Sequence, residues 1–272
     1  MSLLRADTSA PARPGSGAPV PDDRILYLRS YLLMRAVIGF LGIALPIALL
    51  LGDGFLFKGV RPARGSLSAY YYSGMRDIFV GSLCVIGVFL VTYKVFERDL
   101  NNVLTVVAGL AAIGVALFST SRPPGMTTPL TPLQKLLGEP AVSHVHYVCA
   151  TLFLGSLGVI SIFFGLQEGR RPPRPGHRSP LFWRRFHWCC AGVIAAAGAF
   201  IAVSMLTGWL AGYCLIIGET AADLAFGLSW LFKGLELDIL LGPTPPAATA
   251  VPPAARRSPA DEAVVDEAAG SA

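Results

Sequence analysis

Long apolar stretches dominate this chain and limit what it can fold into. An α-helix needs about 20 apolar residues to cross roughly 30 Å of hydrocarbon. Six stretches have about this length, and they cover residues 31–52, 77–96, 101–119, 144–166, 188–209 and 213–233. The sequence therefore predicts an all-α fold, a polytopic membrane protein with a single bundle of six transmembrane helices.

The composition supports this interpretation. Hydrophobic residues make up 53% of the chain and charged residues only 14%, whereas a soluble domain carries about 25% charged residues. The mean hydropathy is +0.58. These values exclude a soluble enzyme, a DNA-binding protein and a secreted disulfide scaffold. The five cysteines lie in or beside the apolar stretches and form no C-x-x-C pair, so we interpret them as small buried hydrophobic residues.

Low-complexity ends flank the apolar region. Residues 1–30 and 241–272 are rich in proline and alanine, and we expect both to be disordered cytoplasmic tails. Residues 31–240 form the predicted six-helix domain. The first apolar stretch is longer than the apolar part of a signal peptide, and we expect it to stay in the membrane as an anchor.

The distribution of Lys and Arg predicts the orientation. With both termini in the cytoplasm, 16 of the 22 basic residues lie on the cytoplasmic side and 6 on the outer side. The positive-inside rule therefore predicts an N-in, C-in protein with an even number of spans. Anionic lipid explains the net charge of +5, so we expect membrane lipids and no nucleic acid as partners.

With this orientation, ionisable residues from distant parts of the sequence lie at a similar depth near the outer leaflet. Asp77 begins the second span, His144 and His146 open the fourth, and Glu219 lies about six residues, or roughly 9 Å, inside the sixth. Asp223 follows four residues later on the same helix face. A charged residue near the centre of a membrane helix costs about 2.5–3.5 kcal/mol, so this face is expected to point into the bundle.

Several roles fit these polar residues. Glu219 and Asp223 can accept hydrogen bonds from neighbouring helices and hold the bundle together, or they can bind a lipid headgroup or a small substrate. A metal-dependent hydrolase, with Asp77, His146 and Glu219 as ligands, is a third possibility. His144 and His146 are two residues apart and point to opposite sides of a helix, which argues against a shared metal, and no cofactor is expected.

The outer-side aromatic and basic residues also allow two interpretations. Tyr72 belongs either to an aromatic belt or to a platform for a headgroup. Arg76 forms either an ion pair with Asp77 or a bidentate contact with phosphate. For the two histidines, helical periodicity favours His144, because it continues a stripe of small residues that is typical of a close helix contact. The stripe comprises Val148, Thr151, Gly155 and Gly158.

The stretch SLSAYYYSGMRDIFVGSLCVIGVFLVTYK, together with AGLAAIGVALFST, VHYVCATLFLGSLG and AFGLSWLFKG, resembles uncharacterised six-span inner-membrane proteins of bacteria. More distantly, the order of features is similar to that of eukaryotic DRAM-like six-span proteins. The resemblance implies a multi-pass protein of the bacterial inner membrane, and it favours His146 over His144, a choice we follow. The positions it marks are Ser68, Tyr72, Gly74, Arg76, Asp77, His146 and Glu219.

We therefore expect a non-enzymatic or accessory membrane protein that binds a lipid or a small amphiphile in a polar pocket of the outer leaflet. The candidate ligand-binding residues are Ser68, Tyr72, Arg76, Asp77, His146, Glu219 and Asp223. The alternatives are a metal-dependent intramembrane hydrolase acting on lipid and a small-solute transporter. The sequence disfavours the transporter, because it lacks the paired, broken-helix halves that such folds often have.

Overall fold

A computed structural model describes residues 22–56, 64–92, 100–123, 125–172 and 178–235. The chain divides into two compact units, residues 1–27 with 241–272, and residues 28–240. Of the first unit, only residues 22–27 lie in the described part. The second unit contains nearly all the described helices.

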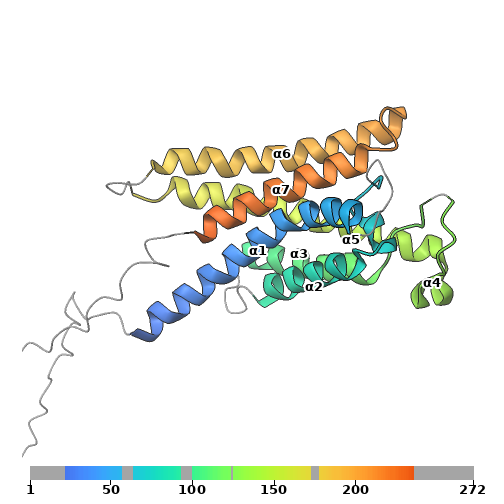
Figure 1. Cartoon of the computed structure of the whole chain (residues 1–272). Helices are drawn as coiled ribbons and strands as arrows, with labels where there is room; N and C mark the ends of the chain where they lie inside the picture. Colours follow the sequence, from blue (N-terminus) through green and yellow to red (C-terminus); the bar gives the residue numbers. More distant parts are fainter. Residues whose placement is uncertain (1–21, 57–63, 93–99, 124, 173–177, 236–272) are drawn as a thin grey trace, which may run out of the picture. The chain divides into compact units, whose positions relative to one another are not determined.

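The described part of the chain is entirely helical in its regular structure and contains no β-strand (Figure 1). Its elements are α1 (Asp22–Phe55), η1 (Ser68–Tyr72), α2 (Arg76–Thr92), α3 (Leu100–Leu117), α4 (Pro132–Leu137), α5 (Glu139–Gly169), α6 (Pro180–Thr207) and α7 (Cys214–Gly234). Five helices are long and apolar enough to cross a membrane: α3, α5, α6, α7 and, within α1, Arg29–Phe55. The protein is therefore a multi-pass, all-α membrane protein.

The predicted second span, residues 77–96, corresponds to α2. This helix has 17 described residues, which at 1.5 Å per residue extend over about 25 Å. The last four residues of the predicted span, 93–96, lie outside the described part of the chain.

The first helix starts earlier than the sequence analysis expects. Because α1 begins at Asp22, residues 22–30 are helical and do not belong to a disordered tail. Leu26 and Tyr27 are highly exposed in this first part of the helix. Hydropathy marks where hydrocarbon burial begins, and a helix can extend beyond that point. The expected tails over residues 1–21 and 241–272 lie outside the described residues.

Helices that follow one another along the chain pack side by side. α2 contacts α3, α3 contacts α5, α5 contacts α6 and α6 contacts α7, and successive helices run in opposite directions (Figure 1). α5 also contacts α7, so α5 has neighbours on several sides. Its buried face carries large side chains, which fill the space between these neighbours: Phe153, Leu157, Ile160 and Phe164.

Small residues allow α1 and α7 to approach closely. A Cβ atom on Gly227 would lie 2.8 Å from the carbonyl oxygen of Gly39, and one on Gly39 would lie 2.7 Å from that of Gly227. Real Cβ atoms essentially never come so near to backbone. Small residues at such crossings are typical of membrane helices, because close backbone contact replaces the missing hydrophobic driving force.

Candidate functional site

The loop between α1 and α2 is fixed onto the bundle by polar contacts. Arg64 donates from Nε to the Asp53 carboxylate at 3.0 Å, and the backbone carbonyl of Gly65 accepts from the amide of Ile216 at 3.0 Å. Tyr70 is buried, and the Arg64 guanidinium lies over its ring, with Cζ 5.7 Å from the ring centroid. Burial raises the pKa of the Tyr70 phenol above its usual value, so the hydroxyl remains protonated at physiological pH.

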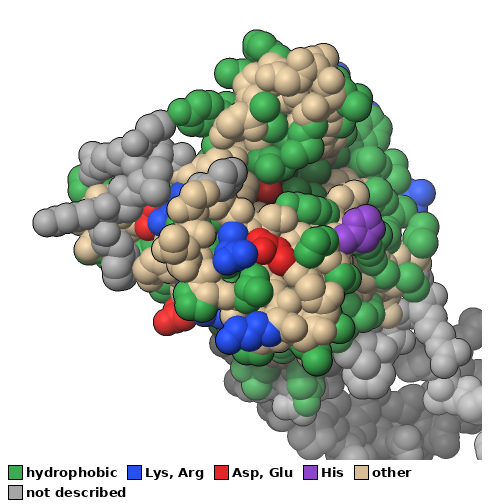
Figure 2. Space-filling model, turned by 90° about the vertical axis from the view of Figure 1, so that its right-hand side faces the viewer, with side chains coloured by type: hydrophobic (Ala, Val, Ile, Leu, Met, Phe, Trp, Pro, Cys, Tyr) green, Lys and Arg blue, Asp and Glu red, His purple; other side chains and the backbone are tan. Residues whose placement is uncertain are grey.

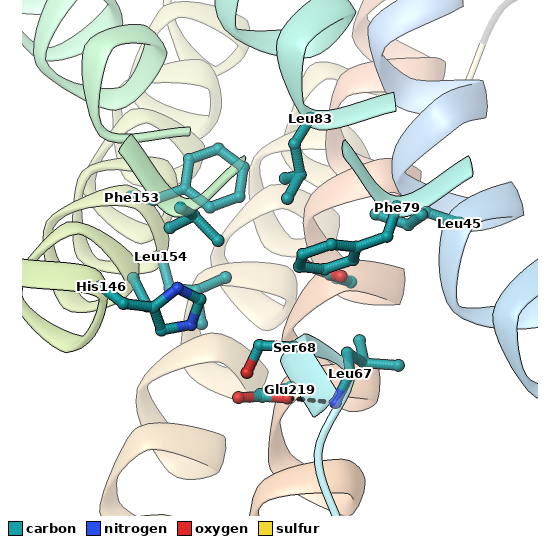
Figure 3. A pocket seen from close by; sticks show the side chains of 12 residues that line it. Leu45, Leu67, Ser68, Phe79, Leu83, His146, Phe153, Leu154 and Glu219 are labelled. Carbon is teal, nitrogen blue, oxygen red and sulfur yellow. Dashed lines mark hydrogen bonds between the residues drawn. The ribbon is translucent and has the colours of Figure 1, made fainter. Parts of the chain in front are cut away.

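Glu219 of α7 connects this loop to the membrane helices. Its Oε2 atom accepts a hydrogen bond from the backbone amide of Leu67 at 2.6 Å (Figure 3). Leu67 is the residue that precedes η1, so the carboxylate satisfies an amide at the start of that short helix. This contact gives Glu219 the structural role that the sequence analysis considered.

A cavity of about 50 Å³ lies beside this contact. Four of its lining residues have polar side chains: Ser68 from η1, His146 from α5, and Glu219 and Asp223 from α7. Figure 3 shows His146 and Glu219 on opposite sides of the same space. The remaining lining is apolar and comprises Leu45, Leu67, Phe79, Leu83, Val115, Ala150, Phe153 and Leu154.

A backbone carbonyl that directly follows α3 holds the His146 ring in one orientation. Its Nδ1 atom lies 2.7 Å from the carbonyl oxygen of Phe118, and because a carbonyl only accepts, Nδ1 carries the proton. In the neutral ring, Nε2 is then an acceptor. His146 is only 2% exposed, whereas His144 is exposed.

The preference for His144 from helical periodicity is therefore wrong about which histidine faces the bundle. Most of the small stripe that supported it points outward: Val148, Thr151 and Gly155 are exposed. α5 contributes large side chains to the interior, whereas a close contact between glycines occurs between α1 and α7.

Asp223 differs from Glu219 in having no polar partner. Within the part of the chain that the structure describes, its carboxylate makes no hydrogen bond or ion pair, and Glu219 is the other acidic residue in the lining of the same cavity. Asp223 is partly buried and lines the cavity. A carboxylate in such a setting is costly unless it meets a donor or a cation.

Three of the predicted site residues do not line the cavity. The hydroxyl of Tyr72 donates to the carbonyl of Thr120 at 2.6 Å and accepts from Gln134 Nε2 at 2.8 Å. Arg76 is exposed and donates to the Tyr71 hydroxyl at 2.7 Å. Asp77 is exposed in the first turn of α2. Tyr72 therefore connects η1 to the segment between α3 and α5. Of the predicted site residues, the structure brings only Ser68, His146, Glu219 and Asp223 together at the cavity.

The face that carries α4 shows few charged side chains, which lie among hydrophobic ones (Figure 2). An acidic side chain is visible there inside a recess between hydrophobic groups.

Among the residues that the structure describes, no three His, Cys, Asp or Glu side chains lie close enough to hold a metal ion. The alternative that groups Asp77 with His146 and Glu219 is not supported by this arrangement, because Asp77 lies outside the cavity.

A second polar cluster lies near the other end of α7, and the sequence analysis missed it. Lys233 of α7 forms an ion pair with Glu168 of α5, and both are buried. Arg171 lies 3.4 Å from the same carboxylate. The sequence signal for it is a glutamate just after one predicted span and a lysine at the end of another. The count of basic residues uses Lys233 only as one of the 16 on the cytoplasmic side.

Aromatic side chains separate this cluster from the cavity. Phe226 packs edge-on against Phe153 and Trp230, with ring centroids 6.1 Å and 5.9 Å apart, and Trp230 packs against Phe164 at 5.3 Å. On α7, Asp223 and Lys233 are ten residues apart, which corresponds to about 15 Å. The aromatic layer isolates the cavity from the buried ion pair.

Comparisons with family models, with curated proteins and with solved structures give no match. The resemblance to bacterial six-span and DRAM-like proteins therefore stays a prediction.

Proposed function

We propose that this protein is a six-span, N-in, C-in protein of a bacterial inner membrane, in which α2 crosses the membrane together with the five long apolar helices. The excess of Lys and Arg on one side supports this orientation. The first and last long helices, α1 and α7, run in opposite directions (Figure 1), which supports an even number of crossings. The cavity then opens on the outer side of the bundle, at the end where η1 meets α7.

In this proposal, the protein binds a lipid or a small amphiphile in the cavity and is not an enzyme. The observation that carries the proposal is the Asp223 carboxylate, which lines a cavity and has no polar partner among the described residues. Apolar side chains surround the four polar groups, which is typical of sites that bind a polar head with an apolar body.

The size of the cavity limits what enters it. A water molecule needs about 10–15 Å³ measured in this way, so 50 Å³ holds a few waters or one small polar group. A complete phospholipid headgroup is too large. The polar end of the ligand would therefore enter, and its hydrocarbon would lie against the apolar lining and the membrane.

The test is native mass spectrometry of the protein purified in detergent. We expect the wild-type protein to retain an amphiphile, and Asp223→Asn to lose it without loss of helical content by circular dichroism. Asp77→Asn is the matched control, since it removes the same charge from an exposed site. Glu219→Ala is less suitable, because it also breaks the contact with Leu67. An unchanged lipid complement in Asp223→Asn would refute the proposal.

A further inference from the structure

The polar lining of the cavity consists mainly of hydrogen-bond acceptors. Nδ1 of His146 is occupied by the Phe118 carbonyl, which leaves Nε2 of the neutral ring as an acceptor in the cavity lining. In their ionised forms, which a cationic partner favours, the carboxylates of Asp223 and Glu219 only accept. Each has two oxygens and about four lone-pair positions, and the Leu67 amide uses one position on Glu219.

Donors are scarce among the same lining residues. The amide of Leu67 is already bonded to Glu219. The Ser68 hydroxyl can donate, but it lies 3.3 Å from the hydroxyl of Ser66 and shares a hydrogen bond with it. No Lys or Arg is among the twelve residues of the lining. The lining therefore has no positive charge of its own, and with its carboxylates ionised it is short of donors.

We propose that the ligand presents a primary ammonium group to this cavity, between Asp223 and His146. The inference rests on the proposed function and names the chemical class of its ligand. A primary ammonium supplies three N–H donors and the opposite charge to the carboxylates. A quaternary ammonium supplies the charge without a donor, an alcohol supplies one donor without charge, and a carboxylate is repelled.

The buried position of His146 supports this choice. Its side chain is 2% exposed, and the bond to Phe118 fixes the ring so that Nε2 keeps one direction. An acceptor of fixed direction in the same cavity as an unpartnered carboxylate favours a ligand with several donors on one atom. Apolar residues such as Phe79 and Leu154 line the same cavity, and they can contact the first carbons of an alkyl chain.

The experiment measures the binding of four probes with the same alkyl chain to the full-length protein in an uncharged detergent: dodecylamine, dodecyltrimethylammonium, dodecanol and dodecanoate. Calorimetric titration gives each dissociation constant. We expect dodecylamine to bind at least about tenfold more tightly than the other three, because hydrogen bonds to charged groups are among the strongest. In Asp223→Asn, the ratio of the dissociation constants of the other probes to that of dodecylamine should fall by about tenfold. In Asp77→Asn, this ratio should stay unchanged.

His146→Gln provides a second variant that does not depend on the first. We expect it to weaken dodecylamine binding and to leave dodecanol binding unchanged. Equal affinities for dodecylamine and dodecyltrimethylammonium would overturn the ammonium inference and leave the proposed amphiphile site standing. A wild-type protein that binds none of the four probes and retains no lipid would overturn the proposed function itself.

Discussion

The buried ion pair between Glu168 and Lys233 gives a quantitative prediction about stability. The side chains are 10% and 2% exposed, respectively. Removing one partner of a buried pair typically costs about 3–5 kcal/mol, because the other charge stays buried without compensation. The two single substitutions should nevertheless differ, since the surroundings of the two charges differ.

Glu168→Gln leaves Lys233 in an interior that already holds a second cation. Arg35 is buried and lies 4.6 Å from the centroid of the Phe164 ring, and Lys233 lies 5.8 Å from the same centroid. We therefore expect the full loss of about 3–5 kcal/mol in the free energy of unfolding.

Lys233→Met should cost less than Glu168→Gln. It keeps the packing of the lysine stem, and it leaves Glu168 with Arg171 at 3.4 Å. The side chain of Arg171 is 37% exposed, so its attraction to the Glu168 carboxylate is that of a surface ion pair. Such pairs contribute about 0–1 kcal/mol to stability, which offsets only part of the loss of Lys233. Solvent near Arg171 adds to this compensation. We expect a loss of about 2–4 kcal/mol from the same accounting.

The assay is reversible unfolding in mixed micelles, in which the fraction of sodium dodecyl sulfate is raised and helicity is followed by circular dichroism. The double variant Glu168→Gln with Lys233→Met closes the mutant cycle, and its loss should be much smaller than the sum of the single losses. The reasoning would be refuted if Lys233→Met were as costly as Glu168→Gln, or if the two losses added.

Three further predictions concern packing, the hydrogen bonds of Tyr72 and topology. Gly227→Ala should lower the free energy of unfolding by about 1–3 kcal/mol, because its Cβ would meet the backbone of Gly39. Gly192→Ala is the control and should not destabilise the protein, because the space around Gly192 is open. Equal unfolding curves for the two variants would contradict the close contact. Tyr72→Phe should cost about 1–3 kcal/mol in the free energy of unfolding by the same assay, because the Thr120 carbonyl and the Gln134 amide lose their short hydrogen bonds to the Tyr72 hydroxyl. It should leave dodecylamine binding unchanged, and weaker binding would place Tyr72 in the site. In a cysteine-free background, a membrane-impermeant maleimide added to spheroplasts should label Thr127→Cys. It should label Ser179→Cys only after the membrane is permeabilised. Labelling of both variants in intact spheroplasts, or of Ser179→Cys alone, would exclude the proposed orientation.

The membrane helices were largely predictable, because length and hydrophobicity carry most of the information about a span. The expected stretch 101–119 corresponds to α3 at Leu100–Leu117. The stretch 188–209 begins eight residues after the start of α6 at Pro180, since Arg184 and Arg185 lower the apolar content of its first turns. Helix ends lie at the interface, where hydropathy no longer reports on helix formation.

The site was predictable only in part, because depth in the membrane does not fix the direction of a side chain. Glu219 and His146 were placed at one level and do line one cavity. Asp77 was placed at the same level, but it is exposed on α2. Direction depends on which helix face packs inward, and at α5 the large residues faced inward and the small ones outward.

The central claim is that an ammonium group binds between Asp223 and His146. A crystal structure of the protein grown in lipidic cubic phase with dodecylamine tests it most directly. We predict head-group density within hydrogen-bonding distance of the Asp223 carboxylate and of His146 Nε2. Density for the amine at another site, with the cavity occupied by water alone, would contradict the account.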